Sequence, residues 1–394
     1  MSERWEIGHP LKLSRGLKIL HVGKFFYPYR GGMENFLLDL VVDQNSRGMF
    51  PEVIAHHHHP CRNTAKEYVN GIPVWRTWSF GQFIYAPIAP TFGFHLRRIT
   101  AGTRPAVIHL HLPNLSSFWA LLAPRQIPLV IQWQSDVVRS QFDERLSLLY
   151  PFYRVAEKRL LQRSQAIIAS SDNYLRGSST LGEFKHKCVT IPLGLDGGRL
   201  HRPSRESVNT ARRKFSKCLV LSAGRFTYYK GFDYLIQAAK YVPEADFVIV
   251  GDGPLRPKFT QLVRQLKLED RVFLPGSLSD HDLHTLMAAC DIFCLPSIER
   301  TEAFGIVLLE AMSFGKPLVT TSIQGSAVNW VNLDGETGLV ALPGDAQDLA
   351  KAISKLQKDP ATRSWMGANA RNRLEQHFKI EKVSDKIERL YSTL

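Results

Sequence analysis

The segment Glu302-Ala-Phe-Gly-Ile-Val-Leu-Leu-Glu310 sets two carboxylates eight positions apart around a turn and the start of a helix. A strand-like run, Asp291–Ser297, precedes it, and Ala311–Thr320 follows with a helix end and a further strand. Phe304-Gly305 suits a tight turn, so the helix is expected to open at the amides that follow. Such amides bind anions, and glutamates beside a bound phosphate would accept hydroxyls of an attached sugar. The alternative is a solvated helix with two scattered glutamates.

Short apolar runs alternate with helical patterns along the chain and form two series. The first series is Lys18–Gly23, Glu52–Ala55, Ala106–His111, Leu129–Trp133, Ala166–Ser170 and Val189–Pro192. The second is Leu219–Gly224, Asp246–Gly251, Val272–Leu274, Ile292–Leu295, Leu318–Thr320 and Leu339–Ala341. Near-continuous apolar runs are typical of parallel strands buried on both faces. The sequence therefore predicts an α/β fold with two Rossmann-like domains, residues 1–195 and 196–394, and ligands bound in the cleft between them.

Composition is that of a soluble globular protein, and 394 residues suit two domains. No apolar stretch approaches the ~20 residues that cross a bilayer, and residues 1–16 lack the apolar core of a secretory signal. Five cysteines, an odd number, indicate free thiols in a reducing cytoplasm. Residues 1–195 hold 23 Lys and Arg against 13 Asp and Glu, whereas residues 196–394 hold 27 against 23. The basic first half predicts an anionic partner: nucleic acid, acidic lipid or a phosphorylated substrate.

The loop Gly224-Arg-Phe-Thr-Tyr-Tyr-Lys-Gly231 follows the first strand of the second series and carries Arg225 and Lys230. Two cations at the mouth of a sheet can clamp a diphosphate, and the alternative is a pair of solvated surface cations. The loop is neither a phosphate-binding P-loop nor a Gly-x-Gly-x-x-Gly fingerprint. ATP hydrolysis and hydride transfer therefore lose support.

Three segments of the first domain offer polar groups to the cleft. Gly31-Gly32, at a helix start after the first strand, allows close approach of a ligand, although an ordinary turn would look the same. His111 ends a strand and is expected to face the cleft in a polar or acid–base role, while His109 points to the opposite side or into the core. Asp136 and Arg139 follow the next strand, where a substrate role and a loop salt bridge are equally expected.

No metal site is predicted. The tract His56–His59 lies in an extended loop, where adjacent side chains point alternately apart, so adventitious metal binding is the better interpretation. Asp280-His-Asp282 resembles a metal-binding motif but stands where a helix begins, and helix capping explains it.

Together these segments resemble the GT-B-fold retaining glycosyltransferases of family 4 over roughly residues 18–375. The matching motifs are Gly31-Gly32, His109-x-His-x-Pro-Asn114, Gly224-Arg-x4-Lys-Gly231, Gly251-Asp-Gly-Pro254, Glu302-x7-Glu310 and Asp334-Gly-Glu-Thr-Gly-Leu-Val340. The resemblance implies an acceptor-binding first domain, a nucleotide-sugar-binding second domain, and a last helix that packs back on the first. The implied reaction is hexosyl transfer with retention, in which the departing phosphate takes the acceptor's proton and no metal or other cofactor is needed.

The resemblance also assigns residues. It implies that the donor diphosphate is bound by Gly31, Gly32, Arg225, Lys230, Gly305 and Ile306. Glu302, Ala303 and Phe304 would contact the donor sugar, and Glu310 the ribose. His111 and Glu302 are the implied catalytic residues, and Asp136 and Arg139 the acceptor candidates.

The segments Trp133–Arg139 and Pro296–Glu302 are similar to mannosyl- and rhamnosyltransferases of bacterial O-antigen and exopolysaccharide pathways. That similarity implies a GDP-sugar donor, a polyprenyl-diphosphate-linked saccharide acceptor and a cytoplasmic protein at the inner face of the membrane. Phe80–Tyr85 and Phe92–Arg98 mix aromatics with arginines and could contact anionic lipid, or form an ordinary loop and helix. Gln134, where such proteins often carry histidine, leaves the choice of sugar and acceptor open.

Four rival functions fit part of this pattern. A glycoside hydrolase is disfavoured, because eight residues of one helix would separate the two glutamates by about 12 Å, beyond the ~5–9.5 Å of hydrolase carboxylate pairs. A nucleotide-sugar 2-epimerase and a transferase that uses a UDP-sugar would share the fold. A nucleic-acid-binding protein is disfavoured, because the basic residues are scattered and no recognition motif occurs.

Overall fold

The computed structural model of the protein describes residues 16–83, 86–137 and 144–394. The chain forms two compact units. The first unit is Met1–Gln132, Arg139–Ile167 and Ser384–Leu394, and the second is Trp133–Val138 and Ile168–Val383. Of the helices in the described ranges, none is long and apolar enough to span a bilayer.

An eight-stranded sheet has the order β10-β9-β8-β7-β1-β2-β4-β3. Its strands are β1 Lys18–Val22, β2 Phe50–His56, β3 Ala65–Val69, β4 Ile72–Thr77, β7 Val107–Leu112, β8 Leu129–Trp133, β9 Ala166–Ala169 and β10 Cys188–Thr190. Strand β1 pairs in parallel with β2 and β7, and β2 pairs in parallel with β4. Strand β3 pairs antiparallel with β4, which the sequence analysis did not predict. A short hairpin joins β5 Gln82–Phe83 to β6 Ala86–Pro87.

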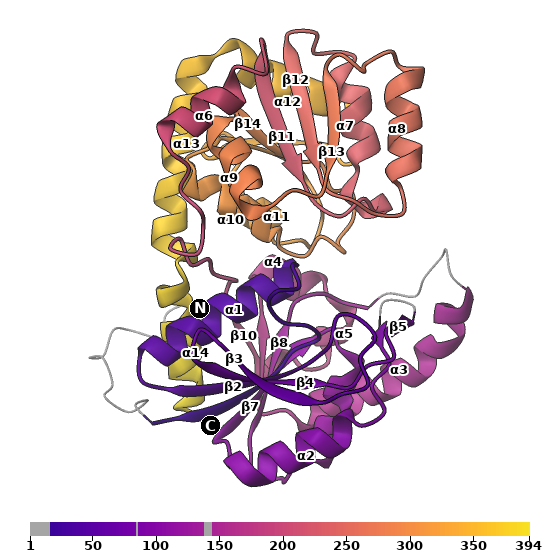
Figure 1. The fold of residues 1–394 in the computed structure, drawn as a ribbon, viewed down its shortest axis with the longest axis vertical. Helices are drawn as coiled ribbons and strands as arrows, with labels where there is room; N and C mark the ends of the chain where they lie inside the picture. The colour runs from indigo at the N-terminus through magenta and orange to yellow at the C-terminus, as the bar shows by residue number, and fades with distance from the viewer. Residues whose placement is uncertain (1–15, 84–85, 138–143) are drawn as a thin grey trace. The chain divides into compact units, whose positions relative to one another are not determined.

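The helical segments of the first unit are α1 Gly32–Ser46, α2 Phe92–Thr103, the 3₁₀ segment η1 Leu115–Leu122, α3 Glu144–Arg163 and most of α14 Ile380–Tyr391. Helix α1 lies along β2 and β4, where Leu37 and Val41 pack with Val53 and Val74 (Figure 1). Arg47 at the end of α1 forms an ion pair with Asp385 of α14.

The second unit has a six-stranded parallel sheet of order β13-β12-β11-β14-β15-β16. Its strands are β11 Cys218–Ala223, β12 Ala245–Val250, β13 Val272–Gly276, β14 Ile292–Leu295, β15 Leu318–Thr321 and β16 Gly338–Ala341. Strands β12 and β14 are buried throughout, as expected of a sheet covered on both faces. All twelve strands predicted from the apolar runs are therefore present, with ends that differ by at most two residues.

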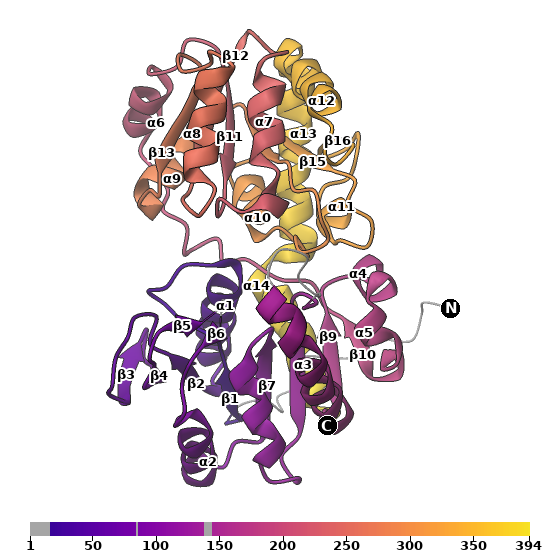
Figure 2. The same cartoon turned by 90° about the vertical axis from the view of Figure 1, so that its right-hand side faces the viewer.

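Helical segments surround this sheet (Figure 2). They are α6 Arg205–Arg212, η3 Tyr228–Lys230, α7 Phe232–Ala239, α8 Arg256–Gln265, α9 Asp280–Ala289, α10 Ile306–Ser313, α11 Val328–Val331, α12 Ala346–Lys358, α13 Pro360–Arg373 and the π-helical turn η4 Leu374–Phe378. The short segments α4 Asp172–Gly177, α5 Ser179–Gly182 and η2 Lys185–Lys187 lie beside β10 of the eight-stranded sheet instead. Helix α7 packs against α8 and α12, and α6 packs against α9. Phe226, Phe232, Phe247 and Phe259 form the centre of the apolar core on the α7 side.

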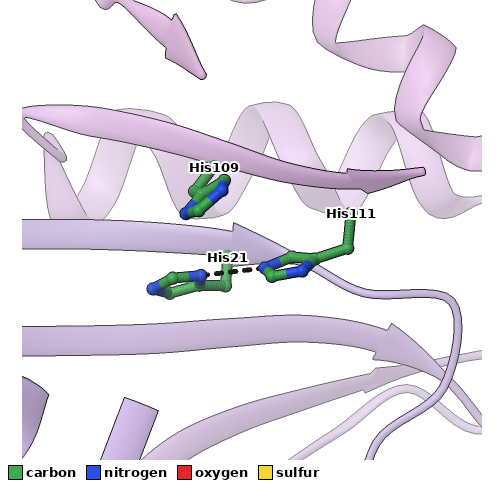
Figure 3. A group of neighbouring side chains, drawn as sticks. All are labelled: His21, His109 and His111. Atoms are coloured by element: carbon green, nitrogen blue, oxygen red, sulfur yellow. Dashed lines mark hydrogen bonds between the residues drawn. The ribbon is translucent and has the colours of Figure 1, made fainter. Parts of the chain in front are cut away.

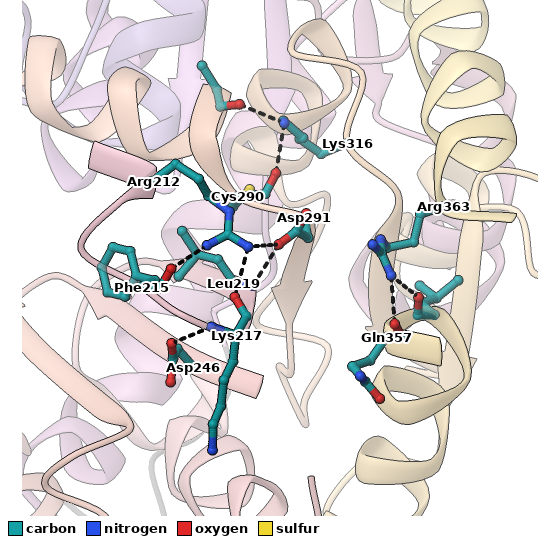
Figure 4. A network of polar contacts seen from close by, with 12 residues as sticks. Arg212, Phe215, Lys217, Leu219, Asp246, Cys290, Asp291, Lys316, Gln357 and Arg363 are labelled. Carbon is teal, nitrogen blue, oxygen red and sulfur yellow. Dashed lines mark hydrogen bonds and ion pairs between the residues drawn. The ribbon is translucent and has the colours of Figure 1, made fainter. Parts of the chain in front are cut away.

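Polar side chains fasten the N-terminal ends of the strands in this unit (Figure 4). Arg212 of α6 donates to the carbonyls of Phe215 and Lys217 at 2.6 and 2.9 Å. It also reaches Asp291 at 3.3 Å, and the same carboxylate accepts the amide of Leu219 at 2.8 Å. These bonds connect the N-terminal ends of β11 and β14. The loops at the C-terminal ends of the two strands take no part in this network.

Candidate active site

The predicted donor residues of the second unit gather at the point where the strand order reverses. Strand β11 has β12 on one side and β14 on the other, so the chain leaves β11 in one direction and later returns to its other edge. In open α/β sheets, ligands bind beyond the carboxyl ends of strands at this switch point. The loop after β11 carries Arg225 and Lys230, and the loop after β14 carries Glu302.

Lys230 and Glu302 form a buried ion pair across these two loops. Lys230 Nζ donates to Glu302 Oε2 at 2.5 Å, and the two side chains are 12% and 10% exposed. Ser297 Oγ donates to the same oxygen at 2.9 Å. Within the described residues, Glu302 Oε1 has no hydrogen-bond partner, which leaves it available to a hydroxyl group.

The ion pair keeps the lysine charged in spite of its burial. Burial acts to lower the pKa of Lys230, but the charge of Glu302 and its hydrogen bond, together with Tyr229, raise the pKa above its usual value. The nearby charge of Arg225 opposes this rise, which places the two cations close together. The side chain of Arg225 is exposed. The loop therefore presents one largely buried lysine and one exposed arginine, two residue types that bind phosphate in different ways.

Gly231 explains how the loop that carries Lys230 comes so close to the end of β14. Its φ of 64° lies in the left-handed region, and a Cβ there would lie 2.2 Å from the carbonyl oxygen of Pro296. A side chain is excluded on both grounds. Glycine thus permits the close approach that brings Lys230 within reach of Glu302.

Helix α10 begins at Ile306, directly after Gly305, as predicted. Gly305 has a φ of 76°, and a Cβ there would lie 2.9 Å from Leu295 Cδ2. The first amides of α10 have no partner within the helix, and the loop directly before them carries Glu302. Glu302 itself precedes the helix, so the two glutamates do not share a single helix.

Glu310 lies on the second turn of α10 and is buried. Arg199 approaches its Oε1 at 3.6 Å. Ala303 and Phe304 are also buried, and the ring of Phe304 packs edge-on against Phe378 at 5.9 Å between centroids. Any contact of these two residues with a sugar would therefore come from their backbone.

In the first unit, Gly31 and Gly32 stand at the start of α1. Gly31 caps the helix in an extended conformation, with a φ of −175°. A Cβ on Gly31 would lie 2.3 Å from Glu34 Oε2, so this carboxylate covers the start of the helix. An anion that binds the amides of Gly31 and Gly32 would have to displace the Glu34 side chain.

His111 lies in a buried cluster with His21 and His109 (Figure 3). His21 Nδ1 is 3.1 Å from His111 Nε2, and His21 Nε2 is 2.8 Å from Gln44 Oε1. His109 Nδ1 is 2.6 Å from the hydroxyl of Tyr391. The expectation that His109 points to the opposite side is wrong, because residues two apart in a strand share a face; its burial in the core is confirmed.

The contact with Gln44 indicates how the protons are placed. An amide oxygen only accepts, so His21 donates from Nε2 and its Nδ1 accepts from His111 Nε2. His111 Nδ1 then carries a lone pair, and it has no partner among the residues described. Burial holds the pKa of His21 at about 4 and, with the charge of His21, holds the pKa of His111 well below its usual value. A neutral His111 can accept a hydrogen bond but would not serve as an acid at neutral pH.

The acceptor candidates differ in what the structure shows. Asp136 accepts hydrogen bonds from Trp133 Nε1 and Ser178 Oγ, both at 2.8 Å, and forms an ion pair with Arg300 at 2.5 Å. The carboxylate of Asp136 is thus engaged within the protein, by Arg300 of the loop after β14 and not by a residue of its own loop. Arg139 lies outside the residues that the structure describes.

A cavity of about 370 Å³ lies elsewhere in the second unit. It is lined by Asn173, Arg176, Gly177, Ile323, Gln324, Gly325, Ser326 and Asn329. None of the predicted donor residues lines it. The turn Gln324–Ser326 forms part of its wall.

Sequence reasoning missed several residues that hold the predicted ones in place, namely His21, Gln44, Arg199, Ser297 and Arg300. His21 carried a signal, because it is a polar residue in the apolar run of β1, which pairs with β7 and sets His21 opposite His109. Gln44, Arg199 and Arg300 contact partners far away in sequence, which no local pattern indicates. Ser297 contacts Glu302 only five residues further along the chain, through a loop whose course the sequence pattern did not give.

Two family descriptions match the chain. Residues 31–194 match "Glycosyl transferase 4-like domain", and residues 206–373 match "Glycosyl transferases group 1".

Among curated proteins, O-antigen chain mannosyltransferase C of Escherichia coli is 30% identical over 380 residues, covering 96% of this chain and 99% of its own length. D-rhamnosyltransferase WbpZ of Pseudomonas aeruginosa is 32% identical over 273 residues, covering 69% of each chain.

Solved structures share the fold. Sucrose-phosphate synthase from Thermosynechococcus elongatus has a TM-score of 0.78 at 23% identity, over 96% of this chain and 98% of that one. HepE of Anabaena, solved in complex with UDP, has a TM-score of 0.74 at 22% identity, over 96% of this chain and all of that one. The GT-B fold predicted from the motifs is confirmed.

Proposed function

Since the chain belongs to family 4 of the GT-B-fold glycosyltransferases, we propose that its donor is GDP-mannose or GDP-rhamnose. The proposed acceptor is a saccharide carried on polyprenyl diphosphate, in O-antigen or lipopolysaccharide biosynthesis. The names of two relatives, a mannosyltransferase of the O-antigen chain and a rhamnosyltransferase, support the sugar and the pathway. A 2-epimerase finds no such support.

The observation that carries the proposal is the ion pair of Lys230 and Glu302 beside Arg225. As the bond between the sugar and the diphosphate breaks, negative charge develops on the leaving group. Lys230 keeps a positive charge in a buried setting, where it stabilises such charge more strongly than in water. Arg225 and the first amides of α10 add to this stabilisation. With this positive charge supplied by the protein, we propose that transfer needs no divalent metal.

Glu302 would serve two purposes in this reaction. Its Oε2 holds Lys230 and Ser297, and its Oε1 would accept a hydroxyl of the donor sugar. His111 would accept a further hydroxyl at Nδ1, because its other nitrogen is committed to His21. The departing phosphate would take the proton of the acceptor hydroxyl, so the sugar keeps its anomeric configuration.

A transfer assay tests this proposal. Full-length protein is given GDP-mannose, GDP-rhamnose or the matching UDP-sugars with a panel of polyprenyl-diphosphate-linked mono- and disaccharides, with and without EDTA. Transfer from a GDP-sugar, unchanged by EDTA, is expected. Lys230→Ala should lower kcat/KM by about 100-fold or more, as the loss of a transition-state donor does. Lys240→Ala removes an exposed lysine of the same unit and should have no effect. Failure to transfer from any GDP-sugar would overturn the donor assignment.

We further propose that the first unit contacts the membrane that carries the acceptor. Apolar side chains are exposed on three neighbouring segments, with Phe94 on α2, Trp119 and Leu122 on η1, and Phe152 on α3. Segment η1 packs against both helices, and the rings of Phe118 and Tyr153 meet at 5.4 Å. Arg97 and Arg98 are exposed on α2. Exposed aromatics edged by arginines suit an anionic lipid surface.

Vesicle flotation tests the membrane contact. Vesicles that contain anionic lipid should bind the protein at low salt, and neutral vesicles should bind less. Trp119→Glu and Phe152→Glu should abolish flotation, whereas Tyr68→Glu, which alters an exposed aromatic residue of β3, should not. Equal flotation of all these variants, or none by the unaltered protein, would contradict the proposal.

A further inference from the structure

Two groups of imidazole and thiol side chains in the described residues come close enough to bind one metal ion. They are His21, His109 and His111, and His57, His59 and Cys61. In each group, one ligand atom from every residue lies within 4.8 Å of the others. The two groups differ in what already occupies those atoms.

The buried group is satisfied by protein contacts. Gln44 fixes His21 as the Nε2–H form, and the two facing nitrogens of His21 and His111 share a proton at 3.1 Å. Gln44 also hydrogen-bonds Tyr391, whose hydroxyl contacts His109. A metal between these rings would have to replace the proton that already joins two of them.

The second group lies in the segment that connects β2 to β3. His57, His59 and Cys61 are alternate residues of a segment that bends at His58 and His59, and one ligand atom of each lies within 4.8 Å of the others. The sequence expectation that neighbouring histidines diverge is wrong for His58 and His59, whose ring centroids are 4.7 Å apart, and the rings of His57 and His59 also lie 5.5 Å from each other. The expectation of adventitious binding thus overlooked Cys61, which completes the set.

The backbone fixes both ends of this group. The amide of His57 donates to the carbonyl of Thr77 at 3.3 Å. Cys61 and Ser79 exchange two hydrogen bonds of 2.9 Å, an isolated antiparallel bridge. The three ligand side chains therefore project from a segment that is held against the residues following β4.

His57 is oriented with a lone pair available. Its ring donates to the carbonyl of Asn63, and its Nε2 is buried without a partner among the residues described. The bonded nitrogen is thus Nδ1, and Nε2 carries the lone pair. A histidine that donates one ring N–H to a backbone carbonyl is the usual arrangement of a metal ligand.

The charge around His57 is close to balanced. The cations that act on His57 include Arg76. Arg76 is itself paired with Glu67 at 2.7 Å, which reduces its repulsion of a cation.

We propose that His57 Nε2, the His59 imidazole and the Cys61 thiolate bind one zinc ion, or a divalent ion of similar softness. Two imidazoles and a thiolate suit such ions, with the fourth tetrahedral position open to water because His59 is exposed. Cys61 loses its thiol proton to solvent on binding. The ion would hold together the segment that connects β2 to β3, and it takes no part in sugar transfer.

Metal titration of the full chain, purified without a histidine tag and freed of metal with EDTA, tests the site. Zinc competed against a chromophoric chelator should bind once per chain at high affinity. Cys61→Ser and His59→Ala should weaken binding by about 100-fold or more, beyond the loss typical of an outer-shell change. His58→Ala is the matched control, because it removes the neighbouring imidazole that lies outside the group, and it should leave the affinity unchanged.

Cobalt provides a second readout. Co²⁺ bound to the unaltered protein and to His58→Ala should show a thiolate-to-cobalt charge-transfer band, which Cys61→Ser should lack. Equal zinc affinity in Cys61→Ser, or an equal loss in His58→Ala and His59→Ala, would show an adventitious ion only and overturn the proposal. Because no nucleotide is present, the result does not depend on the proposed transferase function.

Discussion

At the scale of single residues, the ion pair of Lys230 and Glu302 decides what the donor site can do. Each residue was predicted from the sequence, Lys230 from its place after a strand and Glu302 from its place before a helix. Their contact was not, because the two are 72 residues apart and meet only through the order of β11 and β14. Sequence patterns therefore indicate which residues belong to a site more readily than which of those residues contact one another.

A double-mutant cycle measures this pairing. Lys230→Met leaves Glu302 buried without its partner and should lower the free energy of unfolding by about 3–5 kcal/mol. Adding Glu302→Gln should recover part of that loss, because the unpaired charge is then removed. Urea unfolding of both single variants and the double variant gives the coupling energy. Strictly additive losses would show that the two side chains do not interact.

The buried histidines predict how stability depends on pH. The pKa values of His21 and His56 are lowered from 6.5 to about 4, mainly by burial. Between pH 6.5 and pH 4 these histidines bind more protons in the unfolded chain than in the folded one. Their contribution to the free energy of unfolding is therefore fully present above about pH 6.5 and is lost as the pH falls towards 4. Each histidine should account for on the order of 3 kcal/mol at the acid end. Urea unfolding at a series of pH values checks this, and a free energy that stays level or rises on acidification would contradict it.

At the scale of elements, the strands were the most predictable part of the fold. Apolar runs bounded by polar residues marked twelve strands, because strands buried on both faces carry mostly apolar side chains. The β3–β4 hairpin was missed, because β3 is largely exposed and has no apolar run. Asn70-Gly71 at its turn, with φ of 50° and 78°, was a readable hairpin signal.

The turn between β11 and α7 gives a prediction at this scale. Gly231→Ala should weaken donor binding and destabilise the second unit, since its Cβ would meet the Pro296 carbonyl and push Lys230 away from Glu302. Gly335→Ala is the matched control, because Gly335 has a φ of 76° but a Cβ added there would meet no atom within 4 Å. Gly335→Ala should lower the free energy of unfolding by only about 1–2 kcal/mol, the cost of a left-handed backbone conformation for a residue that has a Cβ. Thermal unfolding and GDP binding of both variants test this, and equal effects would mean that the close approach is unimportant.

At the scale of the whole molecule, the motifs predicted a GT-B glycosyltransferase, and the two α/β units and the relatives confirm it. The domain boundary near residue 195 stays a prediction. Ser384–Leu394 belongs to the first unit, where Tyr391 contacts His109, so the end of the chain helps to hold the histidine cluster. Donor and acceptor identity could not be read from the sequence, because no residue was recognisable as a guanine contact.

The central claim is that a nucleoside diphosphate binds where the strand order of the second unit reverses. Calorimetric titration of GDP, UDP and ADP into the full chain tests it most directly, with Arg225→Ala, Glu310→Gln and the exposed control Arg213→Ala. We expect GDP to bind in preference to UDP and ADP, with an affinity that falls by about tenfold or more in the first two variants and is unchanged in the third. Absence of nucleotide binding by the folded protein, or binding that both site variants leave intact, would contradict the account.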